Sequence, residues 1–129
     1  MHKVVVAPNA FKGTLTATEA AEAIARGVRE VFPDAEVVEV PVADGGDGTV
    51  DALVSASHGE YLTAGVEGPL GDPVSAKYGV IESGRTAVVE LAAASGLTLL
   101  SPSRRDPRKT STYGFGQLLE AAQSRSSRA

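Results

Sequence analysis

The chain has 129 residues, of which 43% are hydrophobic and 22% charged, and its formal net charge is −4. A chain of this length forms one ordinary domain that buries roughly two thirds of its unfolded surface, while the acidic balance and the lack of Trp argue against a nucleic-acid partner. It has no cysteine, which excludes disulfides and thiolate metal sites, and no apolar run approaches the roughly 20 residues that span a bilayer. We therefore expect a cytoplasmic protein with no membrane partner.

The first elements follow the pattern of a parallel sheet. The run VVVA within residues 3–7 is short, β-branched and stopped by Pro8, as is typical of a buried strand. A capping box of Thr16 and Glu19 opens a helix over residues 17–32, and the strand-like run AEVVEVPV follows it. The predicted apolar face of this helix comprises Ala20, Ala21, Ile24, Val28 and Val31. This strand–helix–strand order predicts the start of a Rossmann-like parallel sheet.

The second half of the chain has a different pattern. A short helix is predicted over residues 49–57, and His58-Gly59 ends it. Three strand-like runs follow, separated by the turns GPLGDP and SGR, which predicts antiparallel neighbours. These runs cover residues 61–68, 74–83 and 86–92. A loop over residues 94–110 and a final helix from about Ser111 complete the prediction, and we expect the polar tail QSRSSRA to be disordered.

The turn in VPVADGGDGTV carries two carboxylates between a predicted strand and a predicted helix. Glycine-rich turns of this kind commonly bind phosphate through backbone N–H groups, but Asp44 and Asp47 would repel it. A structural interpretation explains the glycines as turn residues and makes Asp47 or Thr49 a helix cap. The glycines are Gly45, Gly46 and Gly48. Asp44 is left unexplained at the sheet edge where α/β folds gather ligands, so we expect a functional role for it.

Two further segments are candidates for anion binding. Lys12 follows the first strand in NAFKGT, where it either holds a carboxylate or phosphate or is a solvated loop lysine. The segment RRDPRKTSTYGFG places four cations before a helix start, which indicates either an anion site or a solvated charge run followed by a threonine cap. These cations are Arg104, Arg105, Arg108 and Lys109. Neither a Walker motif nor a G-x-G-x-x-G fingerprint occurs, so any nucleotide must be held in another way.

Five segments in this order resemble the bacterial type (type I) of the glycerate kinase family, in its N-terminal part. They are VVVAPNAFKGTLTATEAAEAI, VPVADGGDGTV, GPLGDPVSAKYG, ELAAASGL and RDPRKTSTYGFGQLL. Members of that family phosphorylate glycerate with ATP and a divalent metal, in a cleft between two α/β domains. Where the family often has Asp-Ser-Phe-Lys, this chain has Asn9-Ala10-Phe11-Lys12, and a glutamate frequently stands where this chain has Asp47.

The resemblance implies a site. Asp44 and Lys12 would be catalytic, and Asp44 with Asp47 would hold Mg²⁺ or a similar divalent metal. The substrate-binding residues would be Asn9, Lys12, Ser95, Arg108, Lys109, Thr110 and Thr112. ATP would be the phosphoryl donor and glycerate the small-molecule partner.

The resemblance also implies an architecture. We expect an α/β chain with a Rossmann-like parallel start and a small antiparallel strand group, forming an incomplete part of a two-domain kinase. Residues 1–122 would be the N-terminal portion of a glycerate kinase and residues 123–129 the polar tail. The isolated chain would then be a truncated, inactive fragment. The alternative is a non-catalytic small α/β ligand-binding module or a decayed remnant.

Overall fold

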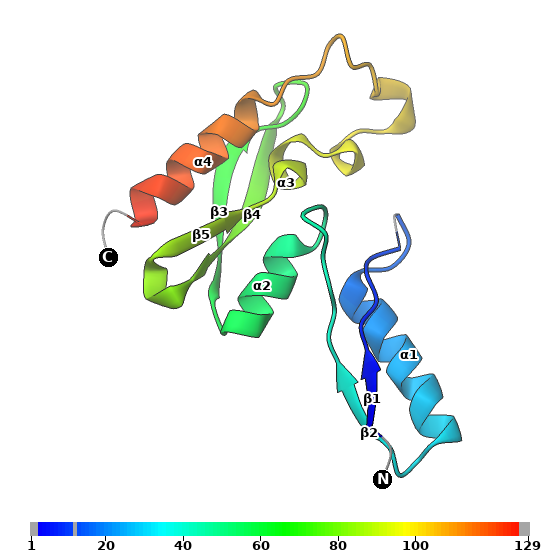
Figure 1. Ribbon diagram of the computed structural model, residues 1–129. Coiled ribbons are helices and arrows are strands. Elements are labelled where there is room, and N and C mark those ends of the chain that lie inside the picture. The colour runs from blue at the N-terminus through cyan, green and yellow to red at the C-terminus, as the bar shows by residue number, and fades with distance from the viewer. Residues whose placement is uncertain (1–2, 12, 127–129) are drawn as a thin grey trace. The chain divides into compact units, whose positions relative to one another are not determined.

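The computed structural model describes residues 3–11 and 13–126, which form two compact units (Figure 1). Unit 1 ends at Ala52 and unit 2 begins at Leu53, so helix α2 (Thr49–Ser57) crosses the division. The assignment of residues 1–122 to the N-terminal portion of a larger protein stays a prediction. Within the described ranges, no helix is both long and apolar enough to cross a bilayer.

Unit 1 begins with the predicted strand–helix–strand pattern. Strand β1 (Lys3–Val6) pairs in parallel with β2 (Glu36–Glu39), and α1 (Ala17–Val31) connects them. The pairing continues beyond β2, because the Val40 N–H donates to the Val6 carbonyl at 2.8 Å. The expected Rossmann-like parallel start is therefore confirmed.

Helix α1 begins at the predicted capping box. The Glu19 N–H donates to Thr16 Oγ1 at 3.2 Å, and the Thr16 N–H donates to Glu19 Oε2 at 2.8 Å. The hydrogen bond from the Thr16 backbone, and then that from its hydroxyl, lowers the pKa of the Glu19 carboxyl. The backbone N–H groups at the start of a helix have no partner within the helix. Because these contacts satisfy two of them, the start of α1 is well defined.

The buried face of α1 is narrower than predicted. Ala20, Ala21 and Ala25 are buried, whereas Ile24 is 44% exposed and Val31 is 69% exposed. The prediction of a five-residue apolar face was therefore wrong for these two residues. A helix is about 10 Å wide, whereas two neighbouring strands lie only about 5 Å apart, so the two-stranded sheet covers only the central alanines.

Unit 2 contains the predicted antiparallel sheet. Strand β3 (Glu60–Glu67) pairs with β4 (Pro73–Ile81), and β4 pairs with β5 (Thr86–Val89). The third strand ends earlier than predicted, because α3 (Leu91–Ser95) follows it directly. Its three consecutive alanines favour a helix over continued strand. Short 3₁₀ helices occupy Glu82–Gly84, Leu97–Leu99 and Pro102–Arg104.

Helix α4 (Tyr113–Ser126) packs against β3, β5 and α3 and closes the core of unit 2 (Figure 1). The buried core residues are Val66, Ala76, Tyr78, Ala94, Leu118 and Ala122. A Cβ on Gly114 would collide with the Glu67 carbonyl, so glycine is required where the helix meets the strand. The helix also extends through Ser126, so residues 123–126 are helical rather than part of a disordered tail, and 127–129 lie outside the described residues.

Candidate functional site

Hydrogen bonds between residues two or three positions apart hold the turn ahead of α2. Asp44 Oδ1 accepts from the Gly46 N–H at 3.1 Å, and Thr49 Oγ1 donates to the Gly46 carbonyl at 2.8 Å. Gly45 and Gly48 have φ of 96° and 93°, a conformation that side-chain-bearing residues rarely adopt. The predicted turn glycines are therefore structurally required at two positions. One carboxylate oxygen of Asp44 shapes the turn, and the side chain remains exposed.

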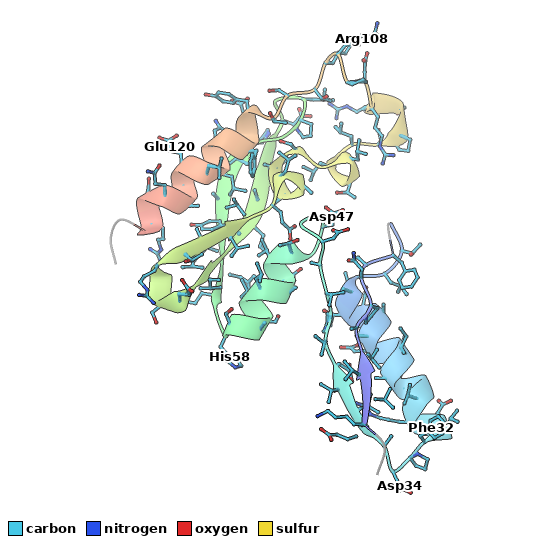
Figure 2. The ribbon with its side chains drawn as sticks, in the orientation of Figure 1. Phe32, Asp34, Asp47, His58, Arg108 and Glu120 are labelled. Carbon is cyan, nitrogen blue, oxygen red and sulfur yellow. The ribbon has the colours of Figure 1, made fainter. Side chains whose placement is uncertain are left out.

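Asp47 lies in the same turn, immediately ahead of α2 (Figure 2). Its side chain is exposed and forms no hydrogen bond with another residue of the described ranges. Among described residues, no group of three or more His, Asp or Glu side chains is arranged to hold a metal. The donor set of Asp44 and Asp47 still fits Mg²⁺, which proteins often bind through one or two carboxylates together with phosphate oxygens and water.

The loop after β1 is compact. The Phe11 N–H donates to the Leu15 carbonyl at 2.9 Å, and Gly13 has a φ of 75°. Asn9 is exposed, and its Oδ1 accepts from the Ala10 N–H at 2.7 Å. Lys12, the predicted catalytic and substrate-binding lysine, lies outside the described residues.

Unit 2 contains a pocket of about 380 Å³ that brings three predicted substrate-binding residues together. It is lined by Pro69, Ser95, Gly96, Leu97, Leu100, Thr110, Ser111 and Thr112. Ser95 comes from the end of α3, whereas Thr110 and Thr112 precede α4. Ser95 Oγ is buried and has no hydrogen-bond partner within the part of the chain that the structure describes.

The pocket walls are tied together by contacts between distant segments. The Ser111 N–H donates to the Pro69 carbonyl at 2.9 Å, which joins the segment before α4 to the β3–β4 turn. Arg104 donates to Asp72 of the same turn at 3.0 Å. Pro69 and Ser111 were not predicted as site residues from the sequence. Pro69 lies in GPLGDPVSAKYG and Ser111 in RDPRKTSTYGFGQLL, and these two segments, which carry the family resemblance, are the signal that could have identified them.

Three of the four predicted cations in the loop before α4 donate hydrogen bonds to other protein groups. Arg108 binds both carboxylate oxygens of Asp106 at 3.1 Å, and its side chain points outward at the tip of this loop (Figure 2). The Arg108 side chain, and then its N–H, lowers the pKa of the Asp106 carboxyl. Arg105 Nε donates to the Leu100 carbonyl at 3.3 Å. Neither Arg108 nor Lys109 lines the pocket.

Comparisons with known proteins agree with this arrangement of segments. Residues 4–129 match the sequence model of the Glycerate kinase family. The chain is 52% identical over 120 residues to the glycerate kinase of Bacillus subtilis (strain 168), which covers 93% of this chain and 31% of the relative. It is 50% identical over 117 residues to the glycerate 2-kinase of Escherichia coli (strain K12), covering 91% of this chain and 31% of the relative. The chain therefore belongs to the glycerate kinase family.

A solved structure shares the fold. A crystal structure from Salmonella typhimurium LT2 that carries the provisional name glycerate kinase 2 is similar to this chain with a TM-score of 0.73. The two are 46% identical, and the match covers 95% of this chain and 33% of the other. The chain thus spans about a third of the length of the relatives it matches.

Proposed function

We propose that the protein carrying this chain is a glycerate kinase of the bacterial type (type I), which transfers the γ-phosphoryl group of ATP to a hydroxyl of glycerate. The observation that carries the proposal is the family match over residues 4–129, at about half identity to proteins named glycerate kinase. The E. coli relative is named a glycerate 2-kinase, so we take the 2-hydroxyl as the acceptor in this chain as well.

In this proposal the turn ahead of α2 orients the acceptor hydroxyl or binds the metal. Phosphoryl transfer needs an oriented hydroxyl and a carboxylate that accepts its proton or holds a divalent ion. Asp44 supplies that carboxylate, and Asp47 lies close to it in sequence as a second metal ligand. Mg²⁺, when bound, neutralises negative charge on the transferred phosphoryl group.

We assign substrate binding to the other predicted residues. Lys12 supplies a positive charge for a carboxylate or phosphate, and Asn9 lies three residues before it. Ser95, Thr110 and Thr112 contribute hydroxyls from the pocket of unit 2. Arg108 and Lys109 contribute positive charge at the loop before α4, although Arg108 would first have to leave Asp106.

The test is a coupled ADP-release assay on the protein as its gene encodes it. ADP release should require glycerate, ATP and Mg²⁺ together, and the product should be 2-phosphoglycerate. Asp44→Asn should lower kcat by roughly 10²-fold or more, the usual loss for a missing general base. Its side-chain oxygen still accepts from the Gly46 N–H, so the turn and the melting temperature should be retained.

Asp47→Asn is the matched control in the same turn. It removes an exposed carboxylate with no hydrogen bond to another described residue, and should cost less activity than Asp44→Asn. Near-full activity of Asp44→Asn, or a loss explained by unfolding, would remove Asp44 from the site. Absence of glycerate-dependent ADP release from the wild type would refute the kinase proposal itself.

A further inference from the structure

The turn ahead of α2 contains both Asp-Gly bonds of the chain, Asp44-Gly45 and Asp47-Gly48. Such bonds are chemically labile, because glycine has no side chain to shield its backbone nitrogen from the preceding carboxyl group. The other four aspartates precede Ala, whose Cβ hinders the nitrogen, or Pro, which has no backbone N–H. They are Asp34, Asp51, Asp72 and Asp106. The reactive sequence is therefore concentrated in this one turn.

The structure distinguishes the two Asp-Gly bonds. Asp44 Oδ1 accepts from the Gly46 N–H at 3.1 Å, so this carboxylate is held on the second residue after it and away from the Gly45 nitrogen. Asp47 is exposed on the same turn (Figure 2), and its carboxylate forms no hydrogen bond with another residue of the described ranges. Asp47 is therefore the one of the two whose carboxylate can turn toward the nitrogen of the residue after it.

The surroundings of Gly48 leave its nitrogen accessible. Within the described part of the chain, the Gly48 N–H donates no hydrogen bond, whereas its carbonyl accepts from the Ala52 N–H at 3.0 Å. A Cβ built on Gly48 would meet no heavy atom within 4 Å, so the Asp47 side chain has room to move over it. Thr49 Oγ1 donates to the Gly46 carbonyl at 2.8 Å, which fixes the two sides of this bond but not the Gly48 N–H between them.

We propose that Asp47-Gly48 is a site of spontaneous isoaspartate formation in the folded protein, whereas Asp44-Gly45 in the same turn is protected. The Gly48 nitrogen attacks Asp47 Cγ, a C–N bond forms, and the carboxyl OH leaves with the N–H proton as water. Water then opens the resulting cyclic imide. Attack at the Asp47 backbone carbonyl carbon breaks its bond to the Gly48 nitrogen and leaves the chain connected through Cγ, whereas attack at Cγ restores aspartate.

The product alters the turn without changing the composition of the protein. Isoaspartate adds one methylene to the main chain between Gly46 and Gly48 and transfers the free carboxylate to Cα. Because Thr49 binds the Gly46 carbonyl across the altered residue, the longer main chain should disrupt this contact at the start of α2. The reaction needs no ligand, so it does not depend on the proposed function, although under that function it would displace one of the two carboxylates of the turn.

The experiment follows opening of the imide by mass. The protein as its gene encodes it is incubated at neutral pH in water enriched in heavy oxygen, either folded or denatured in urea, because each opening incorporates one oxygen from the solvent. Proteolysis and fragment-ion mass spectrometry then locate the heavy oxygen. In the folded protein it should enter Asp47 about 5- to 10-fold faster than Asp44, the factor that one hydrogen bond contributes. In urea, which removes the contact with Gly46, the two sites should react at similar rates.

Asp47→Glu tests the assignment, because glutamate keeps the charge at this exposed position but would have to form a larger imide ring, which closes far more slowly. This variant should lose incorporation at position 47 and retain the slow incorporation at Asp44. Asp51→Glu is the matched control, since Asp51 precedes Ala52 and should not contribute.

Two results would overturn the proposal. One is incorporation at Asp47 that is absent from the folded protein or no faster than at Asp44. The other is a preference for Asp47 that persists unchanged in urea, because the difference would then come from the sequence and not from the contact between Asp44 and Gly46.

Discussion

Units 1 and 2 use helices of nearly equal length, α1 with 15 residues and α4 with 14, but bury them to different extents. Helix α4 places Leu118 and Ala122 in a core built on three strands, and Leu118 is fully buried. Helix α1 buries only alanines against two strands and leaves Ile24 partly exposed. The width of the sheet beneath a helix therefore decides how much of its apolar face is covered, and the more strongly amphipathic helix, α1, is here the less buried one.

The largest expected effect tests that difference directly. Leu118→Ala should lower the free energy of unfolding of unit 2 by about 2–5 kcal/mol, the range for removing a large buried aliphatic side chain. Ile24→Ala should cost less than about 1 kcal/mol, because its side chain is already 44% exposed. Amide hydrogen exchange of α4 and α1 would report the two units separately. Equal losses would mean that Ile24 is covered in solution, and the contrast between the units would fail.

A smaller effect should show how much the capping box contributes to the stability of α1 in unit 1. Thr16→Ala removes the hydroxyl that accepts the Glu19 N–H, and should destabilise α1 by about 1 kcal/mol. Thr18→Ala is the matched control, since it removes an exposed hydroxyl within the same helix and should be neutral or slightly stabilising. Comparable destabilisation by both variants, measured by exchange of the α1 amides, would argue against the capping box as the origin of the effect.

The smallest effect concerns pH. The pKa of Glu19 is lowered in the folded state by its hydrogen bonds to Thr16, so its contribution to stability is present above the unfolded-state pKa. That contribution is lost as the pH falls through the lowered folded-state pKa. Protection of the α1 amides should therefore decline on acidification in the wild type, and less steeply in Glu19→Gln. If amide protection declined equally with pH in the two proteins, the Glu19 carboxylate would not be the cause of the pH dependence.

The sequence predicted the elements whose patterns are local. The capping box of Thr16 and Glu19, the parallel strand pair and the three antiparallel strands were all identified from spacing, capping residues and turns. The end of β5 was missed, because the apolar run through Leu91 continues the strand pattern although the alanines after it form α3. Exposure of Ile24 was missed because helical spacing defines a face but not the width of the sheet beneath it.

In the candidate site, too, some residues were predicted from the sequence and others were not. Ser95, Thr110 and Thr112 were chosen from sequence, and the structure places all three around one pocket. Pro69 was not assigned, because the hydrogen bond from Ser111 that joins it to the pocket wall forms only in the folded chain. The pairing of Arg104 with Asp72 joins residues 32 positions apart, so a charge count along the loop could not reveal that this cation is already engaged.

The contact between α4 and β3 has a consequence for association with other chains. Strand β3 lies at one side of its sheet, where unpaired N–H groups invite another strand to add on. The Gln117 side chain accepts the Glu67 N–H at 2.8 Å, and Gly114 lets the helix approach the same residue too closely for any side chain. An incoming strand would have to displace α4 to pair at this end of β3. By permitting this close approach, Gly114 lets α4 satisfy one backbone N–H at the edge of β3 as well as pack against the sheet.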